Sequence, residues 1–389
     1  MRKVGALILV VSLCTILWAM RASAADEWGE IVIPKDSPIK IGLGAMLSGS
    51  YATLGIDIRN GAEMAIAEKG TLLGRKIVLQ AEDDQCEGAP SVAIAEKFCN
   101  DPILVGVVGY MCSGGSIPAS DVHNKYKVVM ISPSSTSLEL TARGIPIFFR
   151  TCWNDKIQGK AAADFALKSK WTKVAVLHDK SAYGQGLAEE FRRNLEKGGG
   201  EVVAFEGLTR GDKDFTPVLT KIKPLNVQLV YFGGMAAEGS LVVRQMRRIG
   251  IKAKFLSDDG CYTEKDFIQA SGKAAEGAFV TYAKTPEAAA FADWVKRFEA
   301  KYGPRQTFSP QAYDAAKILM MAVEKVAQKK DDGGIVIGKK ALRDAVAATQ
   351  YEGVTGTITF DQYGDRTGSV VAVNKVVCDK GKCSFKEVK

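Results

Sequence analysis

The sequence predicts an α/β fold of two doubly wound, parallel-sheet domains. Short runs rich in Val and Ile end in loops of small residues, and each loop leads into a stretch with helical spacing of apolar residues. This unit repeats, is interrupted at residues 148–154, and then begins again. Helices late in the chain must cover a sheet already formed, so we expect the chain to return to the first domain and cross again. Such multiple crossings favour a hinge between the domains.

The first 24 residues are typical of a secretory signal peptide. Arg2 and Lys3 precede an apolar run over residues 4–20, and the small residues that follow provide a cleavage site after Ala24 or Ala25. Without this segment, about 365 residues with a net charge of about +5 remain, a length that suits two domains. The mild charge, without a basic cluster, gives nucleic-acid binding little support.

In the first half, the expected strands and helices alternate. The strands cover residues 39–45, 76–81, 103–109 and 128–132, and the helices cover 55–69, 91–100 and stretches that begin near Ser116 and Thr136. Because helices link the strands, we expect the strands to run parallel. An acidic cluster at 82–84 follows the second strand. We interpret these residues as a solvated strand end and not as a metal site.

After the interruption, a second series of the same kind begins. The expected strands cover residues 174–177, 201–205, 229–232, 255–257 and 278–282, and the helices cover 158–168, 187–197, 214–221 and 239–249. Further helices are expected at 291–301, 311–328 and 339–348, before a β-rich tail from Val354.

Two consecutive loops of the first half carry small hydroxyl residues. Residues 111–116 (MCSGGS) follow one buried strand, and residues 132–137 (SPSSTS) follow the next. The second loop contains Thr136 in the T-x-x-E spacing of a capping box, and Ser113 or Ser116 is placed to cap the other helix. Two helix N-termini at neighbouring strand ends would attract a carboxylate or another small anion. The alternative is that these serines only cap their helices.

The second half contributes an acidic strand end, Asp258 and Asp259. Across a cleft from the hydroxyl-rich loops, Asp259 would bind the ammonium of an α-amino acid, while Ser113 and residues 134–136 would hold its carboxylate. The alternative for Asp259 alone is a solvated loop residue. Apolar side chains would contact the rest of such a ligand, namely Leu54, Met111, Met235 and Phe308.

Seven cysteines lie outside the signal segment, and export favours disulfides over metal sites. Cys378 and Cys383 are spaced to staple a β-hairpin turn. Cys86 and Cys112 both follow strands, so a bridge between them would brace the first hydroxyl loop. An odd number leaves at least one thiol unpaired, and we expect this to be Cys99, buried in a helix. The sequence has no zinc-binding spacing of cysteine and histidine, so no metal is expected.

Catalysis has little support in the sequence. The mature chain has two histidines, His123 in a helix and His178 at a strand end beside Asp179, and no G-x-S-x-G elbow accompanies them. A catalytic role for His178 is the alternative. Neither an enzyme nor a cofactor is therefore expected.

Longer motifs extend from Ile39 to about Asp365. They are AMLSG at 45–49, DDQC at 83–86, CSGGSIPASD at 112–121, ELTARG at 139–144, FRT at 149–151, HDKSAYGQGLA at 178–188, KDF at 213–215 and YFGG at 231–234. In these motifs the chain resembles the leucine/isoleucine/valine-binding protein family, the periplasmic solute-binding components of branched-chain amino acid ABC transporters.

The resemblance implies the type I periplasmic binding protein fold, in which two lobes joined by three crossovers close on a ligand. Lobe 1 would comprise residues 38–153 and 284–361, and lobe 2 would comprise residues 154–283 and 362–389. It also implies a periplasmic monomer that delivers a hydrophobic, branched-chain amino acid to an inner-membrane ABC permease, without a cofactor.

The resemblance further implies a disulfide between Cys86 and Cys112 and a set of ligand contacts. The expected contacts are Leu54, Met111, Cys112, Ser113, Ser134, Ser135, Thr136, Tyr183, Met235, Asp259, Gly260 and Phe308. Leu54 and Met235 stand where relatives have tyrosines, and Asp259 replaces a glutamate. These differences leave the side-chain preference open, so a binding protein for an aromatic acid, an amide or another ligand without an amine, or a ligand sensor, is the alternative.

Overall fold

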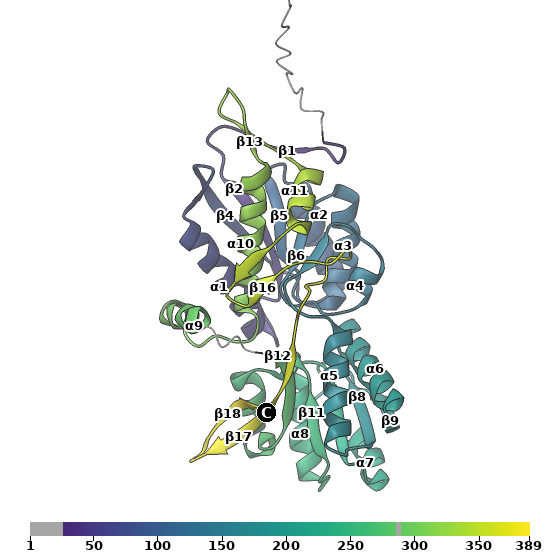
Figure 1. The fold of residues 1–389 in the computed structure, drawn as a ribbon. Coiled ribbons are helices and arrows are strands. Elements are labelled where there is room, and N and C mark those ends of the chain that lie inside the picture. Colours follow the sequence, from purple (N-terminus) through teal and green to yellow (C-terminus); the bar gives the residue numbers. More distant parts are fainter. Residues whose placement is uncertain (1–25, 285–288) are drawn as a thin grey trace, which may run out of the picture.

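The computed structural model describes residues 26–284 and 289–389, which form two lobes (Figure 1). The expected signal peptide, residues 1–24, lies outside these described residues. The upper lobe in Figure 1 contains a six-stranded sheet, and the lower lobe contains a seven-stranded sheet. The fold is therefore α/β with two sheet-centred lobes, as predicted. Within the described ranges, no helix has the length and apolar character needed to cross a membrane.

Lobe 1 is built on a sheet with the strand order β3-β4-β2-β5-β6-β7. Its strands are β2 (Ile39–Ala45), β3 (Thr71–Leu72), β4 (Arg75–Asp83), β5 (Leu104–Gly109), β6 (Met130–Ser132) and β7 (Phe148–Arg150). The neighbours from β4 to β7 run parallel, and β3 joins β4 as an antiparallel edge. Every residue of β5 is buried because this Val-rich strand packs into an apolar core on each face. The sequence pattern missed β7, which coincides with the interruption.

The helices of lobe 1 come from both halves of the chain. They are α1 (Ala52–Lys69), α2 (Gly88–Cys99), α3 (Ser113–Tyr126), α4 (Glu139–Ala142), α9 (Ala289–Tyr302), α10 (Ser309–Val326) and α11 (Lys339–Ala347). The late helix α10 packs along α1. Gly61 of α1 makes this possible, because a Cβ there would lie 2.1 Å from the carbonyl oxygen of Ser309. The chain thus returns to the first lobe after forming the second.

Short antiparallel strands complete lobe 1. They are β1 (Glu30–Ile33), β13 (Gln328–Lys329) and β14 (Ile335–Gly338) in one small sheet, and β15 (Tyr351–Gly353) and β16 (Gly356–Ile358) in another. Sequence reasoning missed all of these except β16, because segments of two to four residues carry too little periodicity to be distinguished from loops.

Lobe 2 repeats the architecture with a mixed sheet in the order β18-β17-β12-β11-β10-β8-β9. Its elements are α5 (Asp155–Lys168), β8 (Lys173–His178), α6 (Ala182–Lys197), β9 (Glu201–Gly207), α7 (Thr216–Ile222), β10 (Leu229–Gly233), α8 (Ala236–Arg248), β11 (Lys254–Ser257), β12 (Phe279–Ala283), β17 (Val371–Asp379) and β18 (Lys382–Glu387). The strands from β9 to β12 are parallel, and the tail strands β17 and β18 form an antiparallel edge. The tail pairs antiparallel because it enters lobe 2 directly from lobe 1, without a crossover helix.

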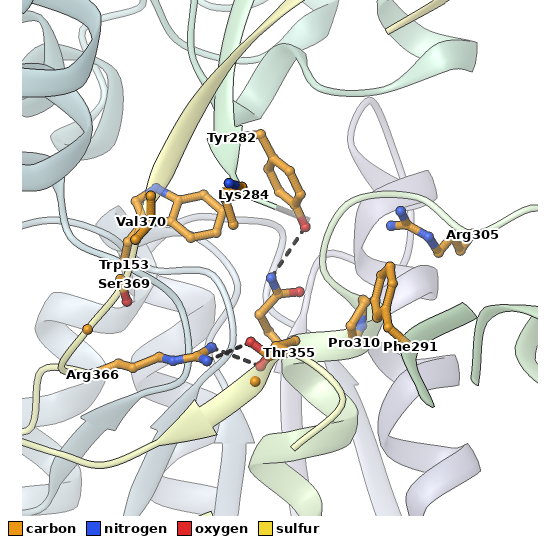
Figure 2. Close-up of a pocket in the computed structure, with 14 residues that line it drawn as sticks. Trp153, Tyr282, Lys284, Phe291, Arg305, Pro310, Thr355, Arg366, Ser369 and Val370 are labelled. Atoms are coloured by element: carbon orange, nitrogen blue, oxygen red, sulfur yellow. Dashed lines mark hydrogen bonds between the residues drawn. The ribbon is translucent and has the colours of Figure 1, made fainter. Parts of the chain in front are cut away.

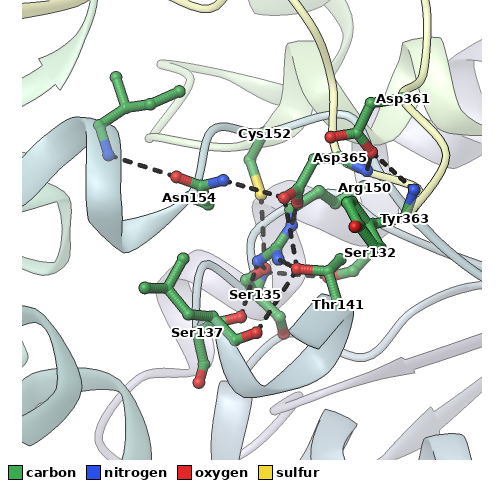
Figure 3. A network of polar contacts seen from close by, with 12 residues as sticks. Ser132, Ser135, Ser137, Thr141, Arg150, Cys152, Asn154, Asp361, Tyr363 and Asp365 are labelled. Carbon is green, nitrogen blue, oxygen red and sulfur yellow. Dashed lines mark hydrogen bonds and ion pairs between the residues drawn. The ribbon is translucent and has the colours of Figure 1, made fainter. Parts of the chain in front are cut away.

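The chain passes between the lobes after β7, after β12 and after β16. A polar network ties the first and third connections to lobe 1 (Figure 3). Arg150 at the end of β7 is fully buried, and its Nε donates to Asp365 Oδ1 (2.5 Å). Asn154 Nδ2 donates to the other oxygen of the same carboxylate (3.0 Å). These bonds hold the first and third connections together beside lobe 1, and the predicted lobe boundaries stay a prediction.

Arg150 also holds the second hydroxyl loop. Its Nη1 donates to the carbonyl oxygens of Ser135 (2.8 Å) and Ser137 (3.0 Å), and its Nη2 donates to Thr141 Oγ1 (2.8 Å). Through these bonds to carbonyl oxygens, the Arg150 side chain fixes the conformation of the loop backbone.

The predicted helix caps are wrong. The helix α4 has four residues, it begins after Leu138, and no side chain caps it. The capping box fails because Arg150 and neighbouring serines hold the loop, so the chain does not enter a helix at Thr136. At α3 the N-cap is Cys112, again without a side-chain bond, and Ser113 Oγ instead accepts the Ser137 amide (3.2 Å).

Both expected disulfides are present. Cys86 is bonded to Cys112, and Cys378 is bonded to Cys383 across the paired strands β17 and β18. In the described ranges, the free thiols are Cys99, Cys152 and Cys261. The expectation of a buried Cys99 is wrong, since this thiol is partly exposed while the other two are buried.

Candidate functional site between the lobes

A narrow cavity of about 40 Å³ lies between the facing loops of the two lobes; we call it the interlobe cavity. It brings together most of the predicted contacts: Leu54, Met111, Cys112, Ser113, Ser134, Tyr183, Met235, Asp259, Gly260 and Phe308. Ser135 and Thr136 do not line it. Five further lining residues were not predicted: Cys86, Gly114, Asp179, Ser181 and Arg210.

The first turn of α3 faces the interlobe cavity through Ser113 and Gly114. The first amides of a helix have no acceptor within it, and the helix dipole places partial positive charge at this end. The Cys86–Cys112 disulfide holds the residue before the helix against the loop that follows β4. This wall therefore presents fixed N–H donors suited to an anionic group.

The serines of the second loop differ in function. Ser134 Oγ lies at the cavity and donates to the Met111 carbonyl (2.8 Å). Ser135 Oγ points away from the cavity, because it donates to the Tyr110 carbonyl (3.0 Å) and lies 2.6 Å from Ser116 Oγ. Ser135 thus braces the two loops against each other.

Thr136 lies outside the cavity lining, beside Asp155 at the start of α5. The Asp155 amide donates to the Thr136 carbonyl (3.0 Å). Burial raises the pKa of the Asp155 carboxyl to about 7, and the facing Thr136 hydroxyl opposes this rise. Neither Thr136 Oγ1 nor either Asp155 oxygen has a hydrogen bond of normal geometry among the described residues. These buried groups are thus free to bond with a ligand or with each other after a small movement.

Lobe 2 contributes acids at the end of β11. Tyr183 donates its phenolic hydrogen to Asp259 Oδ1 (2.9 Å), and the Gly260 amide donates to the Tyr183 oxygen (3.0 Å). Asp258 Oδ2 accepts the Gly234 amide (2.9 Å). Burial raises the pKa of both aspartates, and each carboxylate opposes ionisation of the other. Asp259 is 2% exposed and lines the cavity, so it faces inward and not solvent.

Asp179 is a third buried acid on the same wall. Its Oδ1 accepts from the amide (2.9 Å) and hydroxyl (2.6 Å) of Ser181, the N-cap of α6. Its Oδ2 has no partner among the described residues, and burial raises its pKa. The sequence signal for Asp179 was its position at a strand end, next to the predicted Tyr183 loop.

Arg210 links the lobes at the mouth of the interlobe cavity. Its guanidinium lies over the ring of Tyr51 at 5.0 Å, and its Nε donates to the Tyr51 oxygen (3.2 Å). Tyr51 in turn donates to Glu238 Oε2 of lobe 2 (3.1 Å). No local sequence pattern distinguishes this arginine from others in loops, so sequence reasoning missed it.

The remaining wall is apolar and includes Leu54, Met235 and Phe308. Asp57 of α1 positions Phe308, because its Oδ2 accepts the amides of Phe308 (2.9 Å) and Ser309 (2.7 Å). These side chains form a surface for a hydrocarbon group beside the polar ends. The cavity as a whole suits a small dipolar molecule with an apolar body.

The two histidines lie outside this cavity. His123 is fully buried, its Nε2 lies 3.2 Å from the Tyr110 hydroxyl, and burial lowers its pKa to about 3. His178 Nδ1 accepts the Lys180 amide (3.2 Å). Among residues 26–284 and 289–389, no three His, Cys, Asp or Glu side chains are grouped to hold a metal ion.

Comparison with known proteins adds family information. A family model described as periplasmic binding protein matches residues 38–382. The Leu/Ile/Val-binding protein homolog 3 of Brucella melitensis is 36% identical over 332 residues, which cover 84% of this chain and 88% of that protein.

Solved structures superpose on most of the chain. The leucine-binding protein LivK of Thermotoga maritima has a TM-score of 0.81 at 26% identity, covering 90% of this chain and 97% of that one. The branched-chain amino acid substrate-binding protein LivJ of Streptococcus pneumoniae, in complex with isoleucine, has a TM-score of 0.77 at 28% identity, covering 90% and 100%.

Proposed function

Because the chain belongs to the periplasmic binding protein family, we propose that it captures a branched-chain or similar hydrophobic α-amino acid between its lobes. Proteins of this family are non-enzymatic transport components. The single observation that carries the proposal is the polarity of the interlobe cavity, with neutral donors on lobe 1 and buried acids on lobe 2. A zwitterion has the matching pair of charges.

The carboxylate of the ligand is proposed to bind lobe 1. The first amides of α3, at Ser113 and Gly114, are the donors, and the helix dipole adds to their attraction. Thr136 Oγ1, which lacks a partner among the described residues, is the third donor after a small shift of the loop. Charge-assisted bonds of this kind each contribute about 1.5–3 kcal/mol.

The ammonium is proposed to bind Asp259. The Tyr183 hydroxyl fixes this carboxylate through Oδ1, the Gln158 side chain lies close to it, and its second oxygen is the proposed acceptor for the ligand. Asp259 is buried, so the ion pair forms in a low dielectric, and the positive charge of the ligand offsets the repulsion between Asp258 and Asp259.

The side chain of the ligand is proposed to lie against Leu54, Met235 and Phe308. The cavity of about 40 Å³ holds about three water molecules, which is less than a leucine side chain needs. We therefore expect Met235 to change rotamer, or the lobes to part slightly, when a ligand enters. Methionine adapts well to such changes because it is unbranched and flexible.

The setting of this activity is proposed to be the periplasm. The N-terminal segment 1–24 has the composition of a secretory signal peptide, and two disulfides suit an oxidising compartment. Periplasmic binding proteins serve ABC transporters, so an inner-membrane permease is the proposed partner, and the protein is proposed to act as a monomer.

A thermal-shift screen of the purified mature protein tests the proposal. A ligand that binds only the native state raises its melting temperature. We expect leucine, isoleucine or valine to give the largest shift among amino acids, organic acids and amides. A shift confined to organic acids or amides would instead assign an amine-free ligand, and no shift with any amino acid would refute the proposal. A pull-down with the ligand-bound protein distinguishes transport from sensing: a permease is recovered in the first case and a receptor in the second.

A further inference from the structure

A second cavity lies at the hinge, and we call it the hinge cavity. Its volume is about 400 Å³, and in the described part of the chain it shares no lining residue with the interlobe cavity. Residues of all three connections line it: Trp153 after β7, Lys284 after β12 and Val370 before β17. Figure 2 shows Trp153 and Val370 on one side and Phe291 and Arg305 on the opposite side.

Gln311 gives the hinge cavity an unmet acceptor. Its side chain is 3% exposed and lines the cavity, and its Nε2 donates to the Tyr282 hydroxyl oxygen (3.3 Å). Its Oε1 has no hydrogen-bond partner among the described residues. A buried amide oxygen without a partner carries a desolvation cost, which a hydroxyl donor would remove.

Arg366 gives the same wall an unmet cationic donor. Its Nη1 donates to the Thr151 carbonyl (3.0 Å) and to Thr355 Oγ1 (2.8 Å), and its Nη2 donates to the carbonyls of Thr355 (2.7 Å) and Thr357 (3.1 Å). Figure 2 shows this guanidinium reaching Thr355 below the cavity. The Nε of Arg366 is buried and has no partner within the described ranges. The guanidinium is thus held in place with one N–H left over.

Charge and shape indicate the class of ligand. Lys284, Arg305 and Arg366 line the hinge cavity, no described carboxylate does, and none of the three forms an ion pair with a described residue. Aromatic surface from Trp153 and Tyr282 completes the wall. A flat apolar body with a negative charge matches these features, since arginine binds carboxylates well and aromatic rings prefer aromatic partners.

We propose that the hinge cavity binds a small aromatic carboxylate, as a second ligand beyond the amino acid of the proposed function. Its carboxylate bonds to Lys284 and Arg305, and its ring packs against Trp153 and Tyr282. Arg366 Nε and Gln311 Oε1 are buried in the cavity wall, and a small movement of these side chains lets them bond to the carboxylate and to a ring hydroxyl. This binding does not require the interlobe cavity to be occupied.

Because of its position, the hinge cavity should change shape when the two lobes close on each other. Since its wall is made by all three connections, its shape changes when the lobes rotate about them. The Lys284 amide donates to the Val370 carbonyl (2.8 Å), so two of these connections move together. Trp153 also stacks on Phe308 (ring centroids 6.1 Å apart), and Phe308 lines the interlobe cavity. A ligand at the hinge therefore favours one lobe arrangement and changes amino-acid affinity.

Calorimetry with 4-hydroxybenzoate as the probe tests the proposal on the full mature protein. It is titrated into the protein alone and into protein saturated with leucine, so that the interlobe cavity is blocked in the second case. We expect binding in both cases, and at least tenfold weaker binding to Lys284→Gln/Arg305→Gln, whose leucine affinity is unchanged. Benzamide, which lacks the charge, is expected to bind at least tenfold more weakly than benzoate, and benzoate more weakly than the hydroxylated acid.

Matched variants separate the two cavities. Met235→Trp fills the interlobe cavity, and Asp259→Asn removes its charge, and both are expected to bind 4-hydroxybenzoate as the unmodified protein does. Absence of probe binding to the unmodified protein would overturn the proposal. Binding that is lost with saturating leucine or in Met235→Trp, but kept in Lys284→Gln/Arg305→Gln, would also overturn it and place the probe between the lobes. Failure of leucine to bind would refute the proposed function alone, because the titration without leucine still tests the hinge cavity.

Discussion

The two walls of the interlobe cavity differ in charge and in how they are held. The lobe 1 wall presents neutral amides and hydroxyls, braced by the Cys86–Cys112 disulfide. The lobe 2 wall presents the buried acids Asp179 and Asp259, held by hydrogen bonds alone, and Arg210, whose guanidinium is engaged by Tyr51 of lobe 1. Because the two walls bind groups of opposite charge, neither wall alone binds both ends of a zwitterion. Both charged ends of a dipolar ligand are bound only when the lobes are together, so the ligand binds the closed form more tightly and drives closure.

Removing the lobe 1 brace is expected to have the largest effect. Cys86→Ala/Cys112→Ala frees a loop of 26 residues in the unfolded chain, which should lower the free energy of unfolding by about 3.5 kcal/mol, as measured by urea titration. The matched control Cys378→Ala/Cys383→Ala opens a loop of 5 residues and should cost less, about 2 kcal/mol. Equal losses, or a larger loss in the control, would show that the brace is unimportant.

Removing the acid of the lobe 2 wall is expected to weaken leucine binding by at least tenfold in Asp259→Ala. The lost charge-assisted contact is worth about 1.5–3 kcal/mol. Calorimetry measures this effect. In the control Asp258→Asn the affinity should not fall, because Asp258 bonds to the Gly234 amide, does not line the cavity and opposes ionisation of Asp259. An affinity unchanged in Asp259→Ala would remove the ammonium assignment.

The acidic wall should also make binding depend on pH. Burial raises the pKa of Asp259 to about 6 in the free protein, and a bound ammonium favours the ionised form and lowers that pKa. Below pH 6 a proton must therefore leave before the ligand binds, and affinity should fall about tenfold between pH 7 and pH 5. The pKa of Asp155, about 7, lies in the same window, so the profile is compared with that of Asp155→Asn. An affinity that is constant over this range in both proteins would contradict an ionised Asp259 as the ligand partner.

The smallest effect is expected from the hydroxyls of lobe 1. Thr136→Val keeps the shape and removes one donor, which should cost about 1.5 kcal/mol, the low end for a charge-assisted bond, or about tenfold in leucine affinity. Ser135→Ala should instead lower stability by a similar amount and leave affinity within about twofold, because Ser135 bonds to the Tyr110 carbonyl behind the wall. The reverse pattern in calorimetry and urea unfolding would show that these two roles are misassigned.

Much of the fold was predictable because buried parallel strands have a strong signature. The run at β5 is apolar throughout, and the strand β2 begins and ends where its residues predict. The two-residue strands and β7 were not predictable, since two or three residues carry too little periodicity, even where the partner is as near as β4 is to β3. The capping box at Thr136 failed for a different reason. The buried Arg150, which contacts this loop only in the folded protein, holds the backbone out of a helix.

The site was predictable where several residues share one strand end. Ser113 and Asp259 follow strands of their respective sheets, and parallel strand ends meet at one edge. Asp179 was within reach of the same argument, because it also ends a strand. Arg210 was not, because a single arginine in a loop carries no signal until the lobes bring it onto Tyr51.

The claim that the ligand is held by both of its charged ends is tested most directly by calorimetry with three molecules of one shape. Leucine carries both charges, 4-methylpentanoate lacks the amine, and 3-methylbutylamine lacks the carboxylate. We predict measurable binding of leucine and at least tenfold weaker binding of both analogues, with the loss for 4-methylpentanoate absent in Asp259→Ala. Binding of 4-methylpentanoate as tight as that of leucine would contradict the account.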